Sequence, residues 1–180
     1  MAKKLLATAT ASSSSSLSFT SGIDSTYDVY EFVFTNMHPA TDDQGITFQV
    51  NASGGSGFNE TITSTFFRAK HDEADSGSHE AVGYVADYDQ AQGTSYQRLC
   101  NDVGNDNDQS TSGIFTLYAP SSTTYVKHFT ARFSETHASD IHMDNFVAGY
   151  INTTSAIDEI DFKFSSGNID AGTIKMFGVS

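Results

Sequence analysis

The chain has 180 residues, of which 38% are hydrophobic and 17% are charged, with 14 Phe, 8 Tyr and no Trp. This length and apolar content are typical of one folded domain, which we expect to span residues 1–180. The formal net charge is -13, and no window supplies the clustered cations that a nucleic-acid surface needs. No run approaches the roughly 18 apolar residues of a membrane-spanning helix. We therefore expect neither nucleic-acid binding nor membrane insertion.

Residues 1–20 predict an N-terminal arm or an edge strand. The first eleven residues (MAKKLLATATA) combine Lys3 and Lys4 with apolar and small residues, as a secretion signal does, but Thr8 and Thr10 interrupt the apolar stretch. We therefore favour a first strand of the mature domain over a cleaved signal. Two alternatives remain for its role, an arm that adds to the sheet of a neighbouring subunit and an ordinary frayed terminus.

Alternating apolar and polar residues run along most of the chain and predict strands. In residues 46–50, for example, three apolar residues share one face, while Thr47 and Gln49 lie on the other. The predicted strands are residues 5–11, 17–20, 29–37, 46–50, 62–69, 113–118, 125–133, 140–151, 157–164 and 173–179. About ten strands at this spacing predict an all-β fold, an antiparallel β-sandwich of jelly-roll type.

Residues 70–108 interrupt the alternation and form one long polar excursion. The segment begins with KHDEADSGSHE and then mixes isolated apolar residues with Asp, Asn and Gln. A short helix near residues 87–92 is one alternative, but we expect mainly a surface loop. Binding residues of sandwich proteins commonly lie on such loops, so a ligand site is to be sought here first.

Two stretches of this excursion are rich in side chains that can bind a cation. The first contains His71, Asp72, Glu73, Asp75, His79 and Glu80, and the second contains Asn101, Asp102, Asn105, Asp106, Asn107 and Asp108. Neither stretch has the HExxH or EF-hand spacing. We interpret both as solvated loops and predict no metal site and no cofactor.

A further group, His137, Asp140, His142 and Asp144, lies outside the excursion. The last three alternate, so they are expected to project from one face of a strand. A carboxylate beside a histidine can serve acid–base catalysis. However, nothing marks a nucleophile or a third partner, and the G-x-S-x-G elbow is missing. We interpret the group as an outward polar face and predict no catalytic residue.

Tyr84, Tyr88 and Tyr96 of the excursion are candidates for stacking on sugar rings. The sequence offers no Trp for the same purpose. Sugar binding through this excursion is therefore an alternative function rather than the first one.

Four phrases carry a resemblance to a known group of proteins. They are SLSFTSGIDSTYDVYEFVFTNMHPATDD (16–43), FFRAKHDEAD (66–75), SSTTYVKHFTARF (121–133) and AGYINTTSAIDEIDFKFSSGNIDAGTIKMFGV (148–179). Together they resemble virion-associated proteins of phages that infect marine bacteria, over nearly the whole chain. The resemblance implies a shared fold and a place on the virion, assembled in the host cytoplasm, and it marks no catalytic residue.

The function that this resemblance implies is that of a virion structural protein and not of an enzyme. Such a protein is a capsid decoration or a head or tail appendage subunit, a homo-oligomer that contacts the major capsid protein or tail and fibre proteins. The main alternative is a carbohydrate-binding module on a tail or fibre, used in attachment to host-surface glycan. A third possibility is a polysaccharide hydrolase or lyase, which requires a pair of carboxylates in a cleft.

Overall fold

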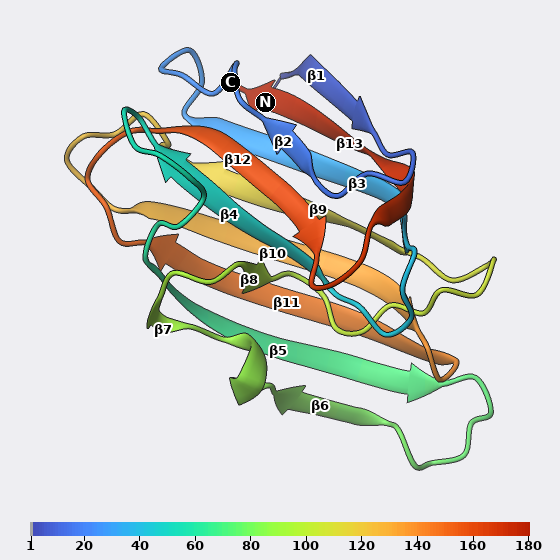
Figure 1. Ribbon diagram of the computed structural model, residues 1–180. Helices are drawn as coiled ribbons and strands as arrows, with labels where there is room; N and C mark the ends of the chain where they lie inside the picture. Colours follow the sequence, from blue (N-terminus) through green and yellow to red (C-terminus); the bar gives the residue numbers. More distant parts are fainter. Residues whose placement is uncertain (1) are drawn as a thin grey trace.

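A computed structural model describes residues 2–180 of the chain (Figure 1). The strands are β1 (Lys3–Thr10), β2 (Leu17–Phe19), β3 (Val29–Pro39), β4 (Ile46–Ala52), β5 (Ile62–Asp72), β6 (Ala81–Tyr84), β7 (Ala91–Gly93), β8 (Gln97–Arg98), β9 (Thr111–Tyr118), β10 (Lys127–His137), β11 (Ile141–Ile151), β12 (Ile157–Phe164) and β13 (Ile169–Val179). A single turn of 3-10 helix, η1, covers Ala86–Tyr88. No helix in the described chain is long and apolar enough to cross a membrane.

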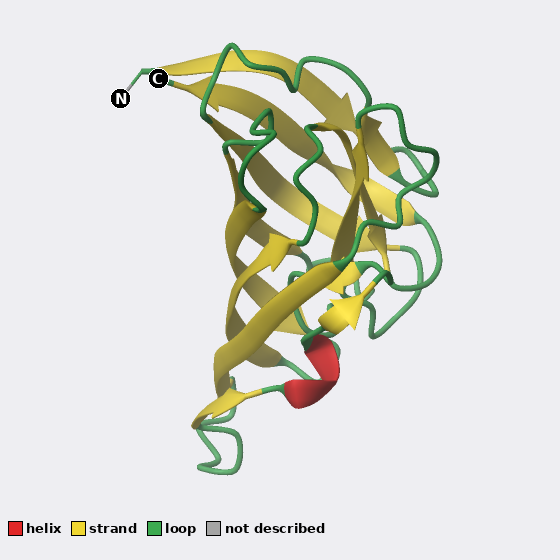
Figure 2. Cartoon of the chain, turned by 90° about the vertical axis from the view of Figure 1, so that its left-hand side faces the viewer, coloured by secondary structure: helices red, strands yellow, loops and turns green. Residues whose placement is uncertain are grey.

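The strands form two antiparallel sheets. The larger one has nine strands in the order β1-β13-β3-β9-β10-β11-β5-β6, with β7 also paired to β5, and the smaller one has the order β2-β12-β4-β8. The smaller sheet lies across one face of the larger sheet in Figure 1, and the side view in Figure 2 shows the curved large sheet on one side and most loops on the other. This arrangement confirms the predicted all-β antiparallel sandwich.

The two ends of the chain meet at one edge of the larger sheet. Ala2 and Ser180 exchange two backbone hydrogen bonds of 3.0 and 3.1 Å, and β1 continues this pairing along β13. Within residues 1–20, β1 therefore lies at an edge of the larger sheet, and β2 lies at an edge of the smaller sheet. The N-terminal segment completes the sheet of its own chain.

Aromatic rings fill the space between the sheets. Phe162 of β12 lies at the centre, with its ring centroid 4.9 Å from that of Phe34, 5.3 Å from Phe32 and 5.9 Å from Phe115. These three partners come from β3 and β9 of the larger sheet, so the Phe162 side chain contacts both layers. Phenylalanine supplies the large apolar area that a sandwich core needs, at about 1.5–3 kcal/mol for each fully buried ring.

The excursion over residues 70–108 is more ordered than the sequence predicts. Its first residues complete β5, and after a loop the chain forms β6, which extends the larger sheet beyond β5. The chain then passes through η1 and β7 to β8, which pairs with β4 of the smaller sheet. These three strands have only four, three and two residues. They are too short to display a period of two, which explains why the sequence predicts about ten strands and the structure has thirteen.

The returning part of the excursion covers the outer face of the smaller sheet. Gln49 of β4 donates its Nε2 protons to the carbonyl oxygens of Glu60, Thr94 and Ser95, at 2.9, 3.1 and 3.2 Å. Thr47 and Gln49 do point away from the apolar face of β4, as predicted, but both are buried. Gln49 faces loop backbone, and Thr47 Oγ1 donates to the carbonyl oxygen of Lys163 in β12 at 2.9 Å, so neither side chain faces solvent.

Candidate functional site

The acidic loop after β5 brings together only some of the side chains that could bind a cation. One ligand atom from each of His71, Asp72 and Glu80 lies within 4.8 Å of the others. Asp72 already accepts hydrogen bonds from the backbone and hydroxyl of Ser76, which lower the pKa of its carboxyl. His71 is exposed and lies 3.5 Å from Asp75 and 3.6 Å from Glu80. The contacts describe a loop held by its own side chains.

The second oxygen-rich stretch, residues 101–108, does not converge on one point. Asn101 is buried and accepts a hydrogen bond from Arg68, whereas the backbone of Asn105 donates to Asp42 in another loop. Asp106 accepts a backbone hydrogen bond from Gln109 and closes a turn. The Asx residues of this stretch thus serve loop structure.

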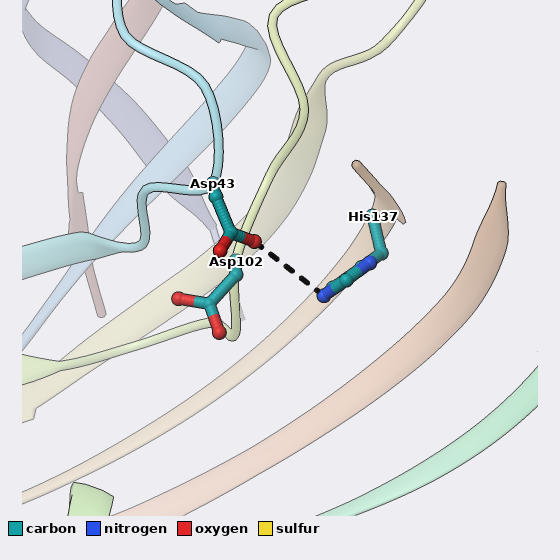
Figure 3. Close-up of side chains that lie close together, drawn as sticks. All are labelled: Asp43, Asp102 and His137. Carbon is teal, nitrogen blue, oxygen red and sulfur yellow. Dashed lines mark ion pairs between the residues drawn. The ribbon is translucent and has the colours of Figure 1, made fainter. Parts of the chain in front are cut away.

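A cluster that the sequence does not predict joins three separate segments (Figure 3). Asp43 precedes β4, Asp102 follows β8 and His137 ends β10, and one ligand atom from each lies within 4.8 Å of the others. His137 Nε2 lies 3.6 Å from Asp43 Oδ1. Burial lowers the pKa of His137, against the opposite effect of the Asp43 carboxylate, so the imidazole is neutral at pH 7.

Asp102 of this cluster is already engaged on the side away from His137. Its Oδ1 accepts from Arg98 and its Oδ2 accepts from the hydroxyl of Tyr88, both at 2.7 Å. A cation would have to compete with the Arg98 guanidinium for the same carboxylate. The cluster therefore contains side chains that could bind a cation, but its hydrogen bonds connect the loops of the protein to one another.

Next to this network, β10 buries a carboxyl group. Glu135 is 2% exposed, and its Oε2 accepts a hydrogen bond of 2.9 Å from the backbone of Asn101. Among the described residues, its Oε1 has no hydrogen-bond partner. Burial raises the pKa of Glu135 to about 8, so the group keeps its proton at neutral pH. A carboxyl enclosed between the sheets cannot reach a substrate, whatever its pKa.

The group predicted near His137 separates into two faces of the larger sheet. His137 turns inward, and Asp140 lies in the tight turn between β10 and β11. His142 and Asp144 point outward: Ser134 Oγ lies 3.1 Å from His142 Nε2, and Arg132 donates to both carboxylate oxygens of Asp144 at 2.9 and 2.7 Å. For these two residues, the predicted outward polar face is confirmed.

The three tyrosines proposed for sugar stacking have different environments, and only one is free to act in this way. Tyr88 packs edge-on against Phe66, and burial raises its pKa to about 12. Tyr96 donates to Asp161 at 2.9 Å and lies under the Lys163 ammonium. Tyr84 is 59% exposed, with its hydroxyl bonded to Asp89. The excursion therefore does not form the aromatic ligand loop that the alternative hypothesis requires.

Two of the hollows on the molecular surface lie on the outer face of the larger sheet, across β5, β11, β10 and β9. Together we call them the outer groove. It consists of two adjoining hollows of about 390 and 340 Å³ that share Ile114 and Arg132. The first is lined mainly by Thr65, Phe67, Thr116, Thr130 and Phe146, and the second by Ser112, Ser134, His142 and Asp144. Hollows of this size fall within the range of ligand-binding clefts.

Two aromatic rings form the apolar part of the outer groove. Phe67 and Phe146 are direct cross-strand partners, and their rings stack in parallel, with centroids 4.9 Å apart and an interplanar angle of 2°. The Arg132 guanidinium covers the other face of Phe146, at 5.0 Å from the ring centroid. Phe67 stays 43% exposed. The sequence signal for this feature is the Phe66–Phe67 pair, because consecutive strand residues face opposite sides and one of the two rings has to point outward.

No family model matches the chain, and no curated protein or solved structure is detectably similar to it.

Proposed function

We propose that the protein is a structural subunit of a phage particle, a capsid decoration or a head or tail appendage protein, that acts through protein contacts and catalyses no reaction. The observation that carries the proposal is the β1 edge of the nine-stranded sheet. Within residues 2–180, β1 pairs with β13 alone, so its second edge faces no other strand of the sheet. An edge of this kind is a template for a strand or edge of another subunit.

The register of β1 identifies the backbone groups on the free side. Because Ala2 and Ser180 exchange both hydrogen bonds, the alternation of an antiparallel ladder turns the N–H groups of Lys3 and Leu5 away from β13. The Leu5 side chain is 51% exposed beside them. Lys3 is already paired with Glu31 at 2.5 Å, whereas Lys4 is exposed at this edge. Lys4 therefore offers a positive charge to an acidic neighbour, including a second copy of this chain of net charge -13.

The phage setting is supported by the four phrases that resemble virion-associated proteins. The strands that contain them, β2, β3, β5 and β10–β13, build both sheets, which agrees with a resemblance that concerns the fold. On a particle, the protein would join its neighbours through the β1 edge and leave the far face of the larger sheet open.

Cryo-electron microscopy of intact particles tests this proposal. We expect density for the domain at a fixed stoichiometry, with β1 against a neighbouring subunit. In a particle-incorporation assay, Leu5→Pro should reduce incorporation, because it removes one outward N–H group without touching the β13 pairing. Leu5→Ala is the matched control that keeps the N–H group. Particles without the protein, or a β1 edge that faces only solvent, would show that the proposal is wrong.

A second candidate function is a carbohydrate-binding module on a tail or fibre. The outer groove favours it, because the groove combines apolar surface with hydroxyl, imidazole, carboxylate and guanidinium groups on one open face. The two functions are compatible, since the groove and the β1 edge occupy different parts of the larger sheet.

A further inference from the structure

The outer groove contains a set of polar groups that hold one another in position. Ser134 of β10 lies between two direct cross-strand partners, Ser112 of β9 and Asp144 of β11. Asp144 is fixed by two hydrogen bonds from Arg132, and Ser134 Oγ lies 3.1 Å from His142 Nε2. All of them project from regular strands and not from loops. A ligand would therefore meet donors and acceptors whose positions are set before it binds.

The charges within the groove cancel. Arg132 and Asp144 form an ion pair of 2.7 Å, so the groove has no excess of either sign, whereas the chain as a whole carries -13. An anionic polymer would be repelled by the rest of the surface, and a cation would find the Asp144 carboxylate already paired. A neutral ligand meets neither obstacle.

The polar groups also distinguish a sugar from a protein partner. The centres of protein interfaces are rich in aromatic residues and depleted in Ser. Here Thr65, Thr116 and Thr130 line the hollow that contains the Phe67–Phe146 stack, and Ser112 and Ser134 line the adjoining one. The groove thus presents many hydroxyl groups next to a small apolar surface. A sugar fits this combination, because it has many hydroxyl groups and an apolar C–H face.

We propose that the outer groove binds a neutral glycan, with the apolar face of a sugar against Phe67 and its hydroxyl groups on Asp144, Ser134 and His142. This inference rests on the second candidate function and names its site and ligand class. It moves the sugar site from the excursion, where Tyr88 and Tyr96 are engaged in internal contacts, to the open face of the larger sheet. The Arg132–Asp144 pair acts as a fixed double hydrogen-bonding unit, and neither side chain serves as a catalyst.

A glycan array with the purified full-length chain tests this inference, followed by calorimetric titration with each neutral oligosaccharide that binds. We expect binding to at least one neutral glycan, and we expect Phe67→Ala and Asp144→Ala each to weaken it by about tenfold or more. Ser134→Ala removes one hydroxyl group and little packing, so it should weaken glycan binding by a smaller factor. It replaces the two larger substitutions as the test if either of them impairs folding. Val82→Ser is the matched control, since Val82 is 79% exposed and does not line the groove.

Three outcomes would overturn the inference: no binding to any neutral glycan, binding that all three groove variants retain, or binding only to anionic glycans. Density of another virion protein seated in the groove would overturn it as well. The test is independent of the virion proposal, because the groove variants leave the β1 edge intact and should enter particles at the level of the unmodified chain. If the groove variants lose glycan binding but enter particles normally, the result concerns the groove alone. If the unmodified chain fails to enter particles, the result concerns the virion proposal alone.

Discussion

The outer faces of the two sheets start from the same sequence pattern and end in opposite environments. On the smaller sheet, the outward residues Thr47 and Gln49 are 3% and 0% exposed. On the larger sheet, the outward residues Phe67 and Ile114 are each 43% exposed. Alternation thus predicts which side chains share a face, but it does not predict whether another segment covers that face.

The difference has consequences for the polar groups on each face. On the covered face each polar group has to find a partner within the protein, because a buried group that loses water and gains nothing costs about 1–3 kcal/mol. Asp161, for example, accepts from both Ser18 and Tyr96. On the open face, water satisfies such groups, and a ligand can replace that water. The open face is therefore the one suited to binding.

Among the polar groups, we expect Glu135 to have the largest effect on stability, because it is buried on a covered face. Its folded pKa of about 8 lies above the ordinary value of 4.5, so burial favours the protonated form. The resulting stability is fully present below pH 4.5 and is lost as the pH rises through 8. Glu135→Gln, which mimics the protonated carboxyl, should be more stable than the unmodified chain at pH 9 by about 5 kcal/mol, at roughly 1.4 kcal/mol for each pKa unit between 4.5 and about 8.

Urea unfolding at pH 5, 7 and 9 measures this effect. The free energy of unfolding of Glu135→Gln should fall less steeply with pH than that of the unmodified chain, and the two should be similar at pH 5. Parallel curves across the range would show that Glu135 does not titrate abnormally in the fold.

The next effect tests the cover over the smaller sheet. Gln49→Ala leaves three carbonyl oxygens of the covering loops without their donor and opens a small cavity. We expect a loss of about 2–3 kcal/mol in the free energy of unfolding. Thr116→Ala on the open face of the larger sheet is the control, and it should change stability by less than about 0.5 kcal/mol. Equal effects of the two changes would contradict the distinction between the faces.

The smallest effect compares two tyrosine hydroxyls within the excursion. Tyr96→Phe removes a part-buried hydrogen bond to Asp161, and we expect a loss of about 1 kcal/mol in thermal or chemical unfolding. Tyr84→Phe removes a hydrogen bond to Asp89 on an exposed side chain, and its effect should lie near zero. A larger loss for Tyr84→Phe would place the tightly packed part of the excursion at β6 and not at residues 94–96.

Much of the fold could be predicted from the sequence because it depends on local alternation. All ten predicted strands occur, and β3 and β4 direct their apolar residues inward as their pattern indicates. The outward direction of His142 and Asp144 follows in the same way from their spacing. These features need only the period of two and the requirement that apolar side chains avoid water.

The sites could not be predicted, because each of them joins residues that are distant in the chain. The pattern that places Phe67 and Phe146 outward says nothing of their stacking, which depends on β5 pairing with β11 at one register. In the same way, Asp43, Asp102 and His137 meet only because two loops come together with the end of β10. The sequence by itself thus determined the strands and the faces of their side chains, since those follow from neighbours in the chain. Only the tertiary structure decided which face is covered and which groups meet, since strand order and loop paths depend on long-range packing.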